Sequence, residues 1–356
     1  MKRGIEKVSI VKCRSYNQKE VDKAVKNALD LIGFEFKHGM KVLIKPNVVG
    51  SFPKKQIATT TNPALVEGVC KILKQKGCKI FIGDSPFTNA EASFKASGID
   101  RIALKYGKLV IFEQDKTKNI TNKKGKILKN FKISKTLADA DLVINMPKLK
   151  THVLTKFTGS VKNLYGVILG GMKQRIHTMA KGDKNFSQVL IDIYQNVKPE
   201  LTIMDAVIGM DGEGPTSGNI KKVGLILASK SGIALDIAAT KMIGLPPHEV
   251  NTIKEAIARK IYPDYEFELV GLNKLPKLKF KIPHEARETQ KKLDVMGIER
   301  RIICNTKKCV KCRMCEKHCP TKSIHLNPYP EVNAKTCIRC FCCIEICPQD
   351  AMGLEK

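Results

Sequence analysis

The residues with the clearest chemistry are eight cysteines near the C-terminus, arranged in two runs of identical spacing. The runs are Cys309-x2-Cys312-x2-Cys315-x3-Cys319-Pro320 and Cys337-x2-Cys340-x2-Cys343-x3-Cys347-Pro348. Four closely spaced cysteines followed by proline are the ligand pattern of a [4Fe–4S] cluster, which carries one electron at a time. Zinc is the competing interpretation, but zinc sites usually pair two Cys-x2-Cys knuckles across a longer loop. The runs therefore predict two [4Fe–4S] clusters.

The ligands of the two clusters are expected to cross between the runs. In bacterial two-cluster ferredoxins the fourth cysteine of each run binds the cluster of the other run. We therefore assign Cys309, Cys312, Cys315 and Cys347 to one cluster, and Cys337, Cys340, Cys343 and Cys319 to the other. The pattern does not need Cys304 or Cys342, which are either bystanders or reactive thiols.

A second group of candidate residues lies in two stretches that contain no Asp or Glu, residues 36–66 and 142–182. The polar residues that could bind a ligand there are Lys45, Asn47, Thr61, Asn62, Lys148, Lys150, Thr158, Lys162 and Asn163. Together they predict a pocket for an anion such as a carboxylate or a phosphate, to which the amides of a helix start could add. The alternative is a set of solvated surface lysines.

Four further residues are candidates for acid–base chemistry. His152 and His177 lie in the second acid-free stretch and could deliver a proton, because histidine titrates near neutral pH. They could instead bind a further metal or be structural histidines. Asp205 and Glu213 flank a glycine-containing segment that we expect to be a flexible acidic loop. They could form a general acid/base pair, hold a lysine of the pocket, or be solvated carboxylates of a plain turn.

The elements that must position these residues alternate between strand-like and helix-like patterns. Strands are expected at 8–11, 42–44, 79–82, 141–145, 201–204 and 223–228, and helices at 20–32, 63–76, 186–197 and 233–243. This order predicts an α/β fold, with a mostly parallel sheet covered by helices on both faces. In such sheets the ligand crevice lies beyond the carboxyl ends of the strands.

The chain is expected to divide into three parts. Residues 1–262 would form the α/β domain, and residues 263–301 a connection with one helix near 285–296. Residues 302–356 would form a small α+β domain resembling a two-cluster ferredoxin.

The formal net charge is +29, from 63 Lys and Arg against 34 Asp and Glu. A basic cluster domain would attract an acidic electron carrier or redox partner protein, although solvated lysines on every face explain part of the excess. Nucleic acid is not favoured, because the chain has no series of stacking aromatic residues and no reader motif. No transmembrane run and no secretory signal is visible, so we expect a cytoplasmic protein.

Several motifs in the first part of the chain resemble those of a known family. They are Lys45-Pro46-Asn47, Thr60-Thr61-Asn62-Pro63, Asn145-x-Pro147-Lys148-x-Lys150-x-His152, Thr158-Gly159-x-x-Lys162-Asn163-x-x-Gly166, and Asp205 through Gly214-Pro215. Over residues 7–261 the chain resembles the DUF362 family, a domain of unknown function. Members are often fused to a two-cluster ferredoxin domain and are common in anaerobic bacteria and archaea. The resemblance implies an uncharacterised iron–sulfur protein and supplies no reaction.

Two functions remain open from the sequence. In the first, the chain is a ferredoxin-linked oxidoreductase whose clusters feed electrons to an anionic small molecule bound in the α/β domain. Clusters alone seldom reduce organic substrates, so this function could require an additional flavin or metal, for which no motif is evident. In the second, the α/β domain only docks an electron carrier onto a partner redox enzyme.

Overall fold

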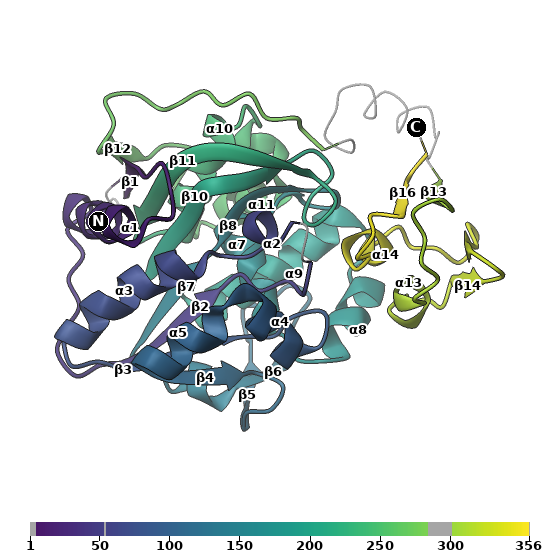
Figure 1. Cartoon of the computed structure of the whole chain (residues 1–356), viewed down its shortest axis with the longest axis horizontal. Helices are drawn as coiled ribbons and strands as arrows, with labels where there is room; N and C mark the ends of the chain where they lie inside the picture. The colour runs from purple at the N-terminus through teal and green to yellow at the C-terminus, as the bar shows by residue number, and fades with distance from the viewer. Residues whose placement is uncertain (1–4, 53–54, 284–300, 356) are drawn as a thin grey trace.

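The computed structural model describes residues 5–52, 55–283 and 301–355. Its centre is one large sheet with the strand order β12-β1-β11-β10-β7-β2-β3-β4 (Figure 1). The strands are β1 (Lys7–Lys12), β2 (Lys41–Pro46), β3 (Lys79–Asp84), β4 (Lys108–Ile111), β7 (Leu142–Met146), β10 (Leu201–Asp211), β11 (Asn219–Ser229) and β12 (Glu268–Val270). From β10 to β4 neighbouring strands are parallel, whereas β11 runs antiparallel to both β10 and β1. The predicted mostly parallel α/β fold is confirmed.

Helices cover both faces of the sheet because successive residues of a strand point to opposite sides. In β2, Leu43 belongs to one apolar core, whereas Val42 and Ile44 belong to the other. Helices α1 (Gln18–Leu31) and α3 (Pro63–Gln75) pack on the side of Val42, and α9 (Gly182–Val197) and α10 (Gly232–Met242) on the side of Leu43.

Shorter elements surround this framework. The helices are α2 (Gln56–Thr59), α4 (Ala90–Ser97), α5 (Ile99–Tyr106), α6 (Lys135–Ala138), α7 (Gly159–Asn163), α8 (Met172–Met179) and α11 (Asn251–Ala258), with 3-10 turns η1 (Leu164–Val167) and η2 (Pro247–Glu249). The strands are the hairpin β5 (Thr117–Thr121) and β6 (Asn130–Ser134), and the pair β8 (Lys148–His152) and β9 (Lys156–Phe157). No helix in the described ranges could cross a membrane.

The loop expected after residue 204 is only partly observed. Strand β10 continues to Asp211 and pairs with β11 up to Asn219, which forms a long two-stranded arm (Figure 1). Glycine serves close packing there: a Cβ at Gly209 would lie 2.7 Å from the carbonyl oxygen of Leu149 in β8. The prediction of a loop was wrong for residues 205–211, where Gly209 lets β8 approach the strand, whereas residues 212–218 do form the turn between β10 and β11.

The C-terminal region repeats itself with a period of 28 residues. Its elements are β13 (Ile302–Cys304), α13 (Met314–Lys317) and β14 (Ile324–Leu326), then β15 (Pro330–Val332), α14 (Cys342–Glu345) and β16 (Met352–Leu354). β13 pairs with β16 and β14 with β15, so each small sheet takes one strand from each half. Arg313 and Phe341, one period apart, have φ of 60° and 59° before the two helices. The small α+β unit is therefore observed.

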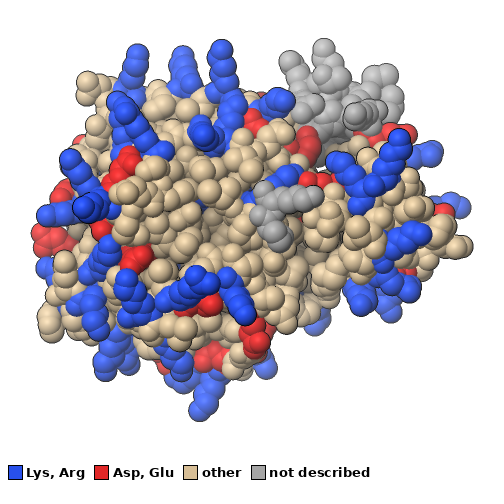
Figure 2. Space-filling view, in the orientation of Figure 1, with Lys and Arg blue, Asp and Glu red and all other residues tan. Residues whose placement is uncertain are grey.

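The segment expected to connect the two parts is only partly described. Its β12 adds to the edge of the main sheet beside β1, and so belongs structurally to the α/β part. The helix expected near 285–296 lies outside the described residues. Figure 1 places the C-terminal region beside α8 and the far end of the β10–β11 arm. Lys and Arg side chains are distributed widely over the visible face and do not gather in one patch (Figure 2).

Candidate functional site

A polar cavity lies beyond the carboxyl ends of β2 and β3, where the sheet topology predicts a ligand site. It encloses about 460 Å³ of space, counting its open mouth. The charged and polar residues that line it are Lys45, Asn47, Asp84, Ser85, Lys150, Thr158, Lys162, Asn163, Tyr165, Lys173 and Glu345. Six of the nine residues that the sequence nominated for anion binding therefore line one cavity, and the other three, Thr61, Asn62 and Lys148, do not.

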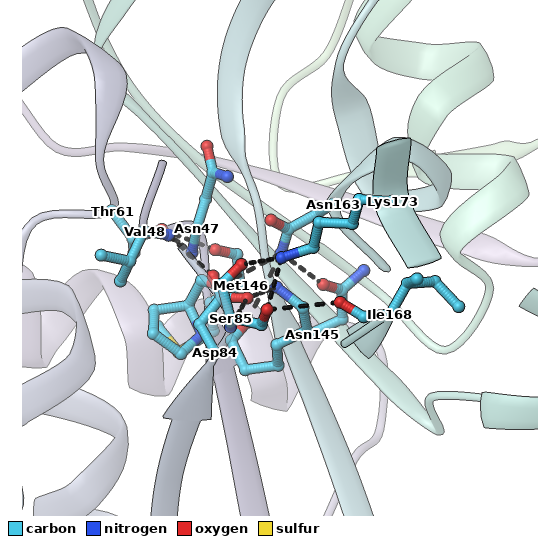
Figure 3. Close-up of polar contacts among 12 residues, drawn as sticks. Asn47, Val48, Thr61, Asp84, Ser85, Asn145, Met146, Asn163, Ile168 and Lys173 are labelled. Carbon is cyan, nitrogen blue, oxygen red and sulfur yellow. Dashed lines mark hydrogen bonds and ion pairs between the residues drawn. The ribbon is translucent and has the colours of Figure 1, made fainter. Parts of the chain in front are cut away.

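Two of the four lysines in the cavity are already paired. Lys45 Nζ lies 2.7 Å from Asp84 Oδ1, and both side chains are at most 2% exposed. Lys173 Nζ donates to the hydroxyl and the carbonyl oxygen of Ser85 and lies 3.7 Å from Glu113 Oε1. Burial lowers the pKa of Lys173 to about 8. Figure 3 shows Asp84, Ser85 and Lys173 converging at the ends of the strands.

The other two lysines have no carboxylate within ion-pair distance among the described residues. Lys150 Nζ donates to the carbonyl oxygen of Thr59 at 2.7 Å and is fully buried. Burial, then the charges of Lys162 and Lys148, lower the pKa of Lys150 well below its ordinary value. Lys162 Nζ lies 5.5 Å above the centre of the Tyr165 ring. A bound anion would relieve the repulsion between Lys150 and Lys162.

Lys148 and Asp205 form a buried pair outside this cavity. Lys148 Nζ lies 2.8 Å from Asp205 Oδ2, and neither side chain is exposed. Tyr16 donates its hydroxyl to Asp205 Oδ1 at 2.8 Å. Because each group pairs with the other away from the cavity, these contacts do not support the predicted roles of anion ligand for Lys148 and acid/base for Asp205. Of the open alternatives for Asp205, the one in which it holds a lysine describes its contacts.

Thr61 and Asn62 also serve the framework and do not line the cavity. The Thr61 hydroxyl donates to the carbonyl of Met146 at 2.6 Å and accepts the backbone N–H of Asn47 at 2.8 Å. Asn62 caps α3 by accepting the N–H of Ala64. These contacts give both side chains a framework role and do not support the predicted ligand-binding one. Glu213 lines a separate cleft beside the C-terminal region. Neither Glu213 nor Asp205 lines the lysine-lined cavity, so the possible acid/base pair is not found there.

His152 is buried against the C-terminal region. Its Nδ1 accepts the backbone N–H of Leu154 at 3.1 Å, which places the proton of the neutral ring on Nε2. That nitrogen lies 3.2 Å from Glu345 Oε1, off the line of a good hydrogen bond. Burial, then the charge of Lys162, lower the pKa of His152 to about 4.

His177 is buried among aromatic rings. It stacks on Phe186 with 4.6 Å between ring centres and meets the edge of Tyr165 at 5.7 Å. Burial lowers the pKa of His177 to about 4. Both histidines are thus neutral at neutral pH and packed against other groups, which does not suit the proton-donor role nominated from the sequence.

Glu345 is the residue of the C-terminal region that lines the cavity and that the sequence analysis missed; the other unpredicted polar residues are Asp84, Ser85, Tyr165 and Lys173. It lies on α14, between Cys343 and Cys347, yet it is buried in the wall of the cavity. Burial alone would raise the pKa of Glu345, but the charges of His152 and Lys162 hold it at about 2. Thr216 also donates its hydroxyl to the backbone carbonyl of Glu345 at 2.9 Å. A glutamate flanked by Ile344 and Ile346 was the available signal.

Three side-chain oxygens of the cavity have no hydrogen-bond partner within the described ranges. They are Asn47 Oδ1, Thr158 Oγ1 and Asn163 Oδ1. All three side chains are buried, none more than 8% exposed. Buried polar atoms in proteins nearly always have a partner, so each such atom requires an explanation.

The eight cysteines of the two runs lie together in the C-terminal region. A small open hollow is lined, among other residues, by Cys309, Cys312, Cys315 and Cys347, three thiols of one run and the fourth of the other. Burial and, after it, the nearby thiolates of Cys340 and Cys319 raise the pKa of Cys337, so these three thiols lie close together. In the part of the chain that the structure describes, no three His, Cys, Asp or Glu residues stand close enough to hold a single metal ion.

Backbone amides donate to the thiols in the same way in both halves. Lys311 N–H donates to Cys309 Sγ and Arg339 N–H to Cys337 Sγ, each at 3.4 Å. Ser323 and Ala351 donate in the same manner to Cys319 and Cys347, each at 3.2 Å. Such donors stabilise thiolates, so this arrangement fits anionic sulfur ligands.

Comparison with known proteins gives a family and one curated relative. The model described as "Domain of unknown function (DUF362)" matches residues 42–241. The thylakoid-associated protein sll1697 of Synechocystis sp. (strain ATCC 27184 / PCC 6803 / Kazusa) is 32% identical over 255 residues, which cover 70% of this chain and 78% of that protein. Among solved structures, the lactate racemase apoprotein from Thermoanaerobacterium thermosaccharolyticum aligns at 18% identity with a TM-score of 0.42, over 66% of this chain and 56% of that one. A likeness this low carries no argument.

Proposed function

Because the chain belongs to the DUF362 family, whose function is unknown, we propose its function from the site itself. We propose that residues 302–355 form a ferredoxin-type domain with two [4Fe–4S] clusters, and that the protein reduces an anionic small molecule bound in the lysine-lined cavity. The observation that carries the proposal is the hollow lined by Cys309, Cys312, Cys315 and Cys347, the ligand set expected for crossed clusters.

The donor set fits the clusters and not a single metal ion. The thiols surround a hollow and do not converge on one point, and the repeated amide donors favour sulfur in its charged form. When bound, two clusters supply one-electron transfer and together store two electrons. Reduced thiols of this kind suit a reducing compartment, so we place the protein in the cytoplasm.

The second cysteine run lies on the side of the domain that faces the lysine-lined cavity. Cys340 and Cys342 are electrostatic neighbours of Tyr165, which lines the lysine-lined cavity. Cys337, Cys340, Cys343 and Cys319 would hold the cluster nearer the cavity, where it would supply electrons one at a time. The residues of this chain have two tasks there: Lys150 and Lys162 attract the anion, and Glu345 closes the wall between the cavity and the cluster.

We propose that the surface beside the first cysteine run binds an acidic electron carrier. A cleft between α8 and the first cysteine run is lined by Arg175, Lys317 and Lys322, with Glu316 as its carboxylate, and it reaches Cys319. A basic surface beside a cluster ligand would speed the encounter with an acidic redox protein, most strongly at low salt.

A carrier or docking module without catalysis is the second candidate. It is favoured by the neutral, packed state of His152 and His177, because neither offers a proton to the cavity at neutral pH. An additional flavin or metal would restore catalysis, and it belongs to the first proposal as a cofactor still to be found.

Metal content tests the cluster proposal. Protein purified without oxygen should contain about eight irons and eight acid-labile sulfides per chain, four for each cluster. Cys347→Ser and Cys312→Ser should disturb the same cluster signal in electron paramagnetic resonance, and Cys319→Ser the other. Cys70→Ser is the control, because Cys70 is a fully buried cysteine of α3 and lies outside both ligand sets. Stoichiometric zinc with almost no iron would exclude the proposal.

Reoxidation kinetics separate the reductase from the carrier. The dithionite-reduced protein is mixed with candidate anions, and the loss of cluster reduction is followed optically. Lys162→Met should abolish reoxidation by a substrate while iron content is kept, and the exposed Lys184→Met serves as the control. If no anion reoxidises the protein but an acidic ferredoxin does, equally in both variants, the chain is a carrier.

A further inference from the structure

We propose that the ligand of the lysine-lined cavity is a small carboxylate that bears hydroxyl groups, of the kind represented by glycerate. The inference rests on the proposed anion site and names its ligand class. It starts from the three unpartnered oxygens, Asn47 Oδ1, Thr158 Oγ1 and Asn163 Oδ1, which all belong to residues of one cavity. Two of them are amide oxygens, which can only accept hydrogen bonds, so the missing partner must donate.

The orientation of the Asn163 amide is fixed by its neighbours. Its Nδ2 donates to Asn145 Oδ1 at 2.7 Å. The Asn145 amide cannot reverse, because its own Nδ2 donates to the carbonyl of Ser160 at 2.9 Å and to its hydroxyl at 3.1 Å. The Asn163 amide is therefore held with its Nδ2 toward Asn145. Its Oδ1 is left as an acceptor for a donor of the ligand.

Thr158 gives the same indication from a helix start. It is the N-cap residue of α7, a position where a threonine hydroxyl usually accepts a backbone N–H. Here the side chain makes no such bond, and its oxygen is buried without a partner. The hydroxyl therefore does not cap the helix and remains available to a ligand in the cavity.

The charges of the cavity call for one negative charge. Four lysines line it, and three carboxylates are in contact with them or in the wall, namely Asp84, Glu113 and Glu345. With all groups ionised, one positive charge remains, on the side of Lys150 and Lys162. A monocarboxylate would neutralise it, whereas an amino acid would place an ammonium among lysines.

The acceptor atoms also select against simpler anions. An unsubstituted carboxylate has no O–H donor and doubly charged hydrogen phosphate has a single one, so either would leave at least one of Asn47 Oδ1 and Asn163 Oδ1 unpaired. A metal cation could meet those oxygens, but the neighbouring lysines would repel it. Two hydroxyls on the carbon chain of the acid supply the two donors that the two amide oxygens lack.

The test compares ligands that differ by one group, using the full cluster-loaded chain without oxygen. Calorimetry or equilibrium dialysis measures the binding of glycerate, propionate, glycerol and phosphate. Glycerate should bind at least about tenfold more tightly than propionate, since it removes at least one unsatisfied acceptor. Glycerol, which lacks the carboxylate, should bind more weakly than either acid. Propionate within about twofold of glycerate, or phosphate binding more tightly than glycerate, would overturn the proposal.

Two variants and a control examine the assignment of individual groups. Thr158→Val removes an oxygen that makes no hydrogen bond, so it should leave thermal stability unchanged and narrow the glycerate-to-propionate ratio. Lys162→Met should weaken both acids to a similar degree. Thr240→Val makes the same chemical change within α10, where the hydroxyl bonds to Asp236 and Ile237 carbonyls, and should leave the ratio unaltered.

Iron content measured on the same samples separates the two proposals. If the protein contains little iron but binds the ligands in the expected order, the clusters are rejected and the ligand class is retained. Full iron content with equal binding of glycerate and propionate would reject the ligand class and retain the clusters. An unchanged ratio in Thr158→Val would exclude that hydroxyl from the site.

Discussion

His177 provides the sharpest test of how the site is assembled, because its burial makes a predictable pH dependence. Its pKa falls from 6.5 in the unfolded chain to about 4 in the folded protein, chiefly through burial. Between these values the unfolded state binds a proton that the folded state refuses, so stability falls as the pH drops from 6.5 toward 4. At pH 5 this difference corresponds to about 2 kcal/mol, and at pH 7.5 it is close to zero.

The substitution His177→Phe should remove this acid sensitivity while keeping the ring packed on Phe186 and Tyr165. Thermal unfolding of parent and variant is measured without oxygen at both pH values and at one heating rate. The variant should gain about 2 kcal/mol relative to the parent at pH 5 compared with pH 7.5, or roughly 3–4 °C in Tm. His325→Phe, at an exposed site, is the control and should show no such change.

Two results would refute this reasoning. If the stability difference between parent and variant is the same at both pH values, His177 is not buried as a neutral ring. If His177→Phe is stable but no longer supports reoxidation by a substrate that the parent uses, the catalytic role suggested by the sequence is correct. Retained reoxidation together with the acid gain would establish a packing role.

Three further predictions concern the framework. Asp205→Asn should destabilise the protein by about 3–5 kcal/mol in thermal or urea unfolding, because it leaves the Lys148 charge buried without its partner. Burial raises the pKa of Asp236 from 3.8 to about 7, so the contribution of this group to stability should decline as pH rises through that interval, and the stability difference between Asp236→Asn and the parent should shift in favour of the variant over the same interval. Gly209→Ala should cost about 1–3 kcal/mol, because its Cβ would press on a backbone oxygen in β8, whereas Gly171→Ala, with open space around it, should be near neutral.

Most of the sheet could be predicted from sequence because its strands are continuous apolar runs. β8 is the instructive failure. Its sequence, Lys148–His152, contains two lysines, a threonine and a histidine, yet every residue is buried. The lysines tolerate burial only because Asp205 and the Thr59 carbonyl meet them from elements distant in sequence. Local pattern carries no trace of those partners, so a buried polar strand has the same sequence signature as an exposed loop.

The same limit applies to the candidate site. Its place at the ends of β2 and β3 followed from the topology of parallel sheets. Which lysines would remain uncompensated did not follow, because that depends on the carboxylate each one meets. Lys45 is neutralised by Asp84 and Lys148 by Asp205, while Lys150 and Lys162 have no such partner in the described part of the chain. An acid-free stretch of sequence therefore indicates a basic region, but only the fold distributes its charges.

The 28-residue repeat shows how a nearly symmetric domain acquires a direction. Position 317 in the first half is an exposed lysine, and its counterpart one period later is the buried Glu345. The residues around them follow the same division: Phe341 to Cys347 are all buried, whereas most of the first run is partly or fully exposed. The segment Phe341 to Cys347 can enter the wall of a lysine-rich cavity because it is apolar and has Glu345 as its single charged residue. The first half, basic and exposed, has the character of a surface that meets an acidic partner. Comparing the two runs position by position would have identified the inward-facing half from sequence alone, since the cysteines repeat and the residues between them do not.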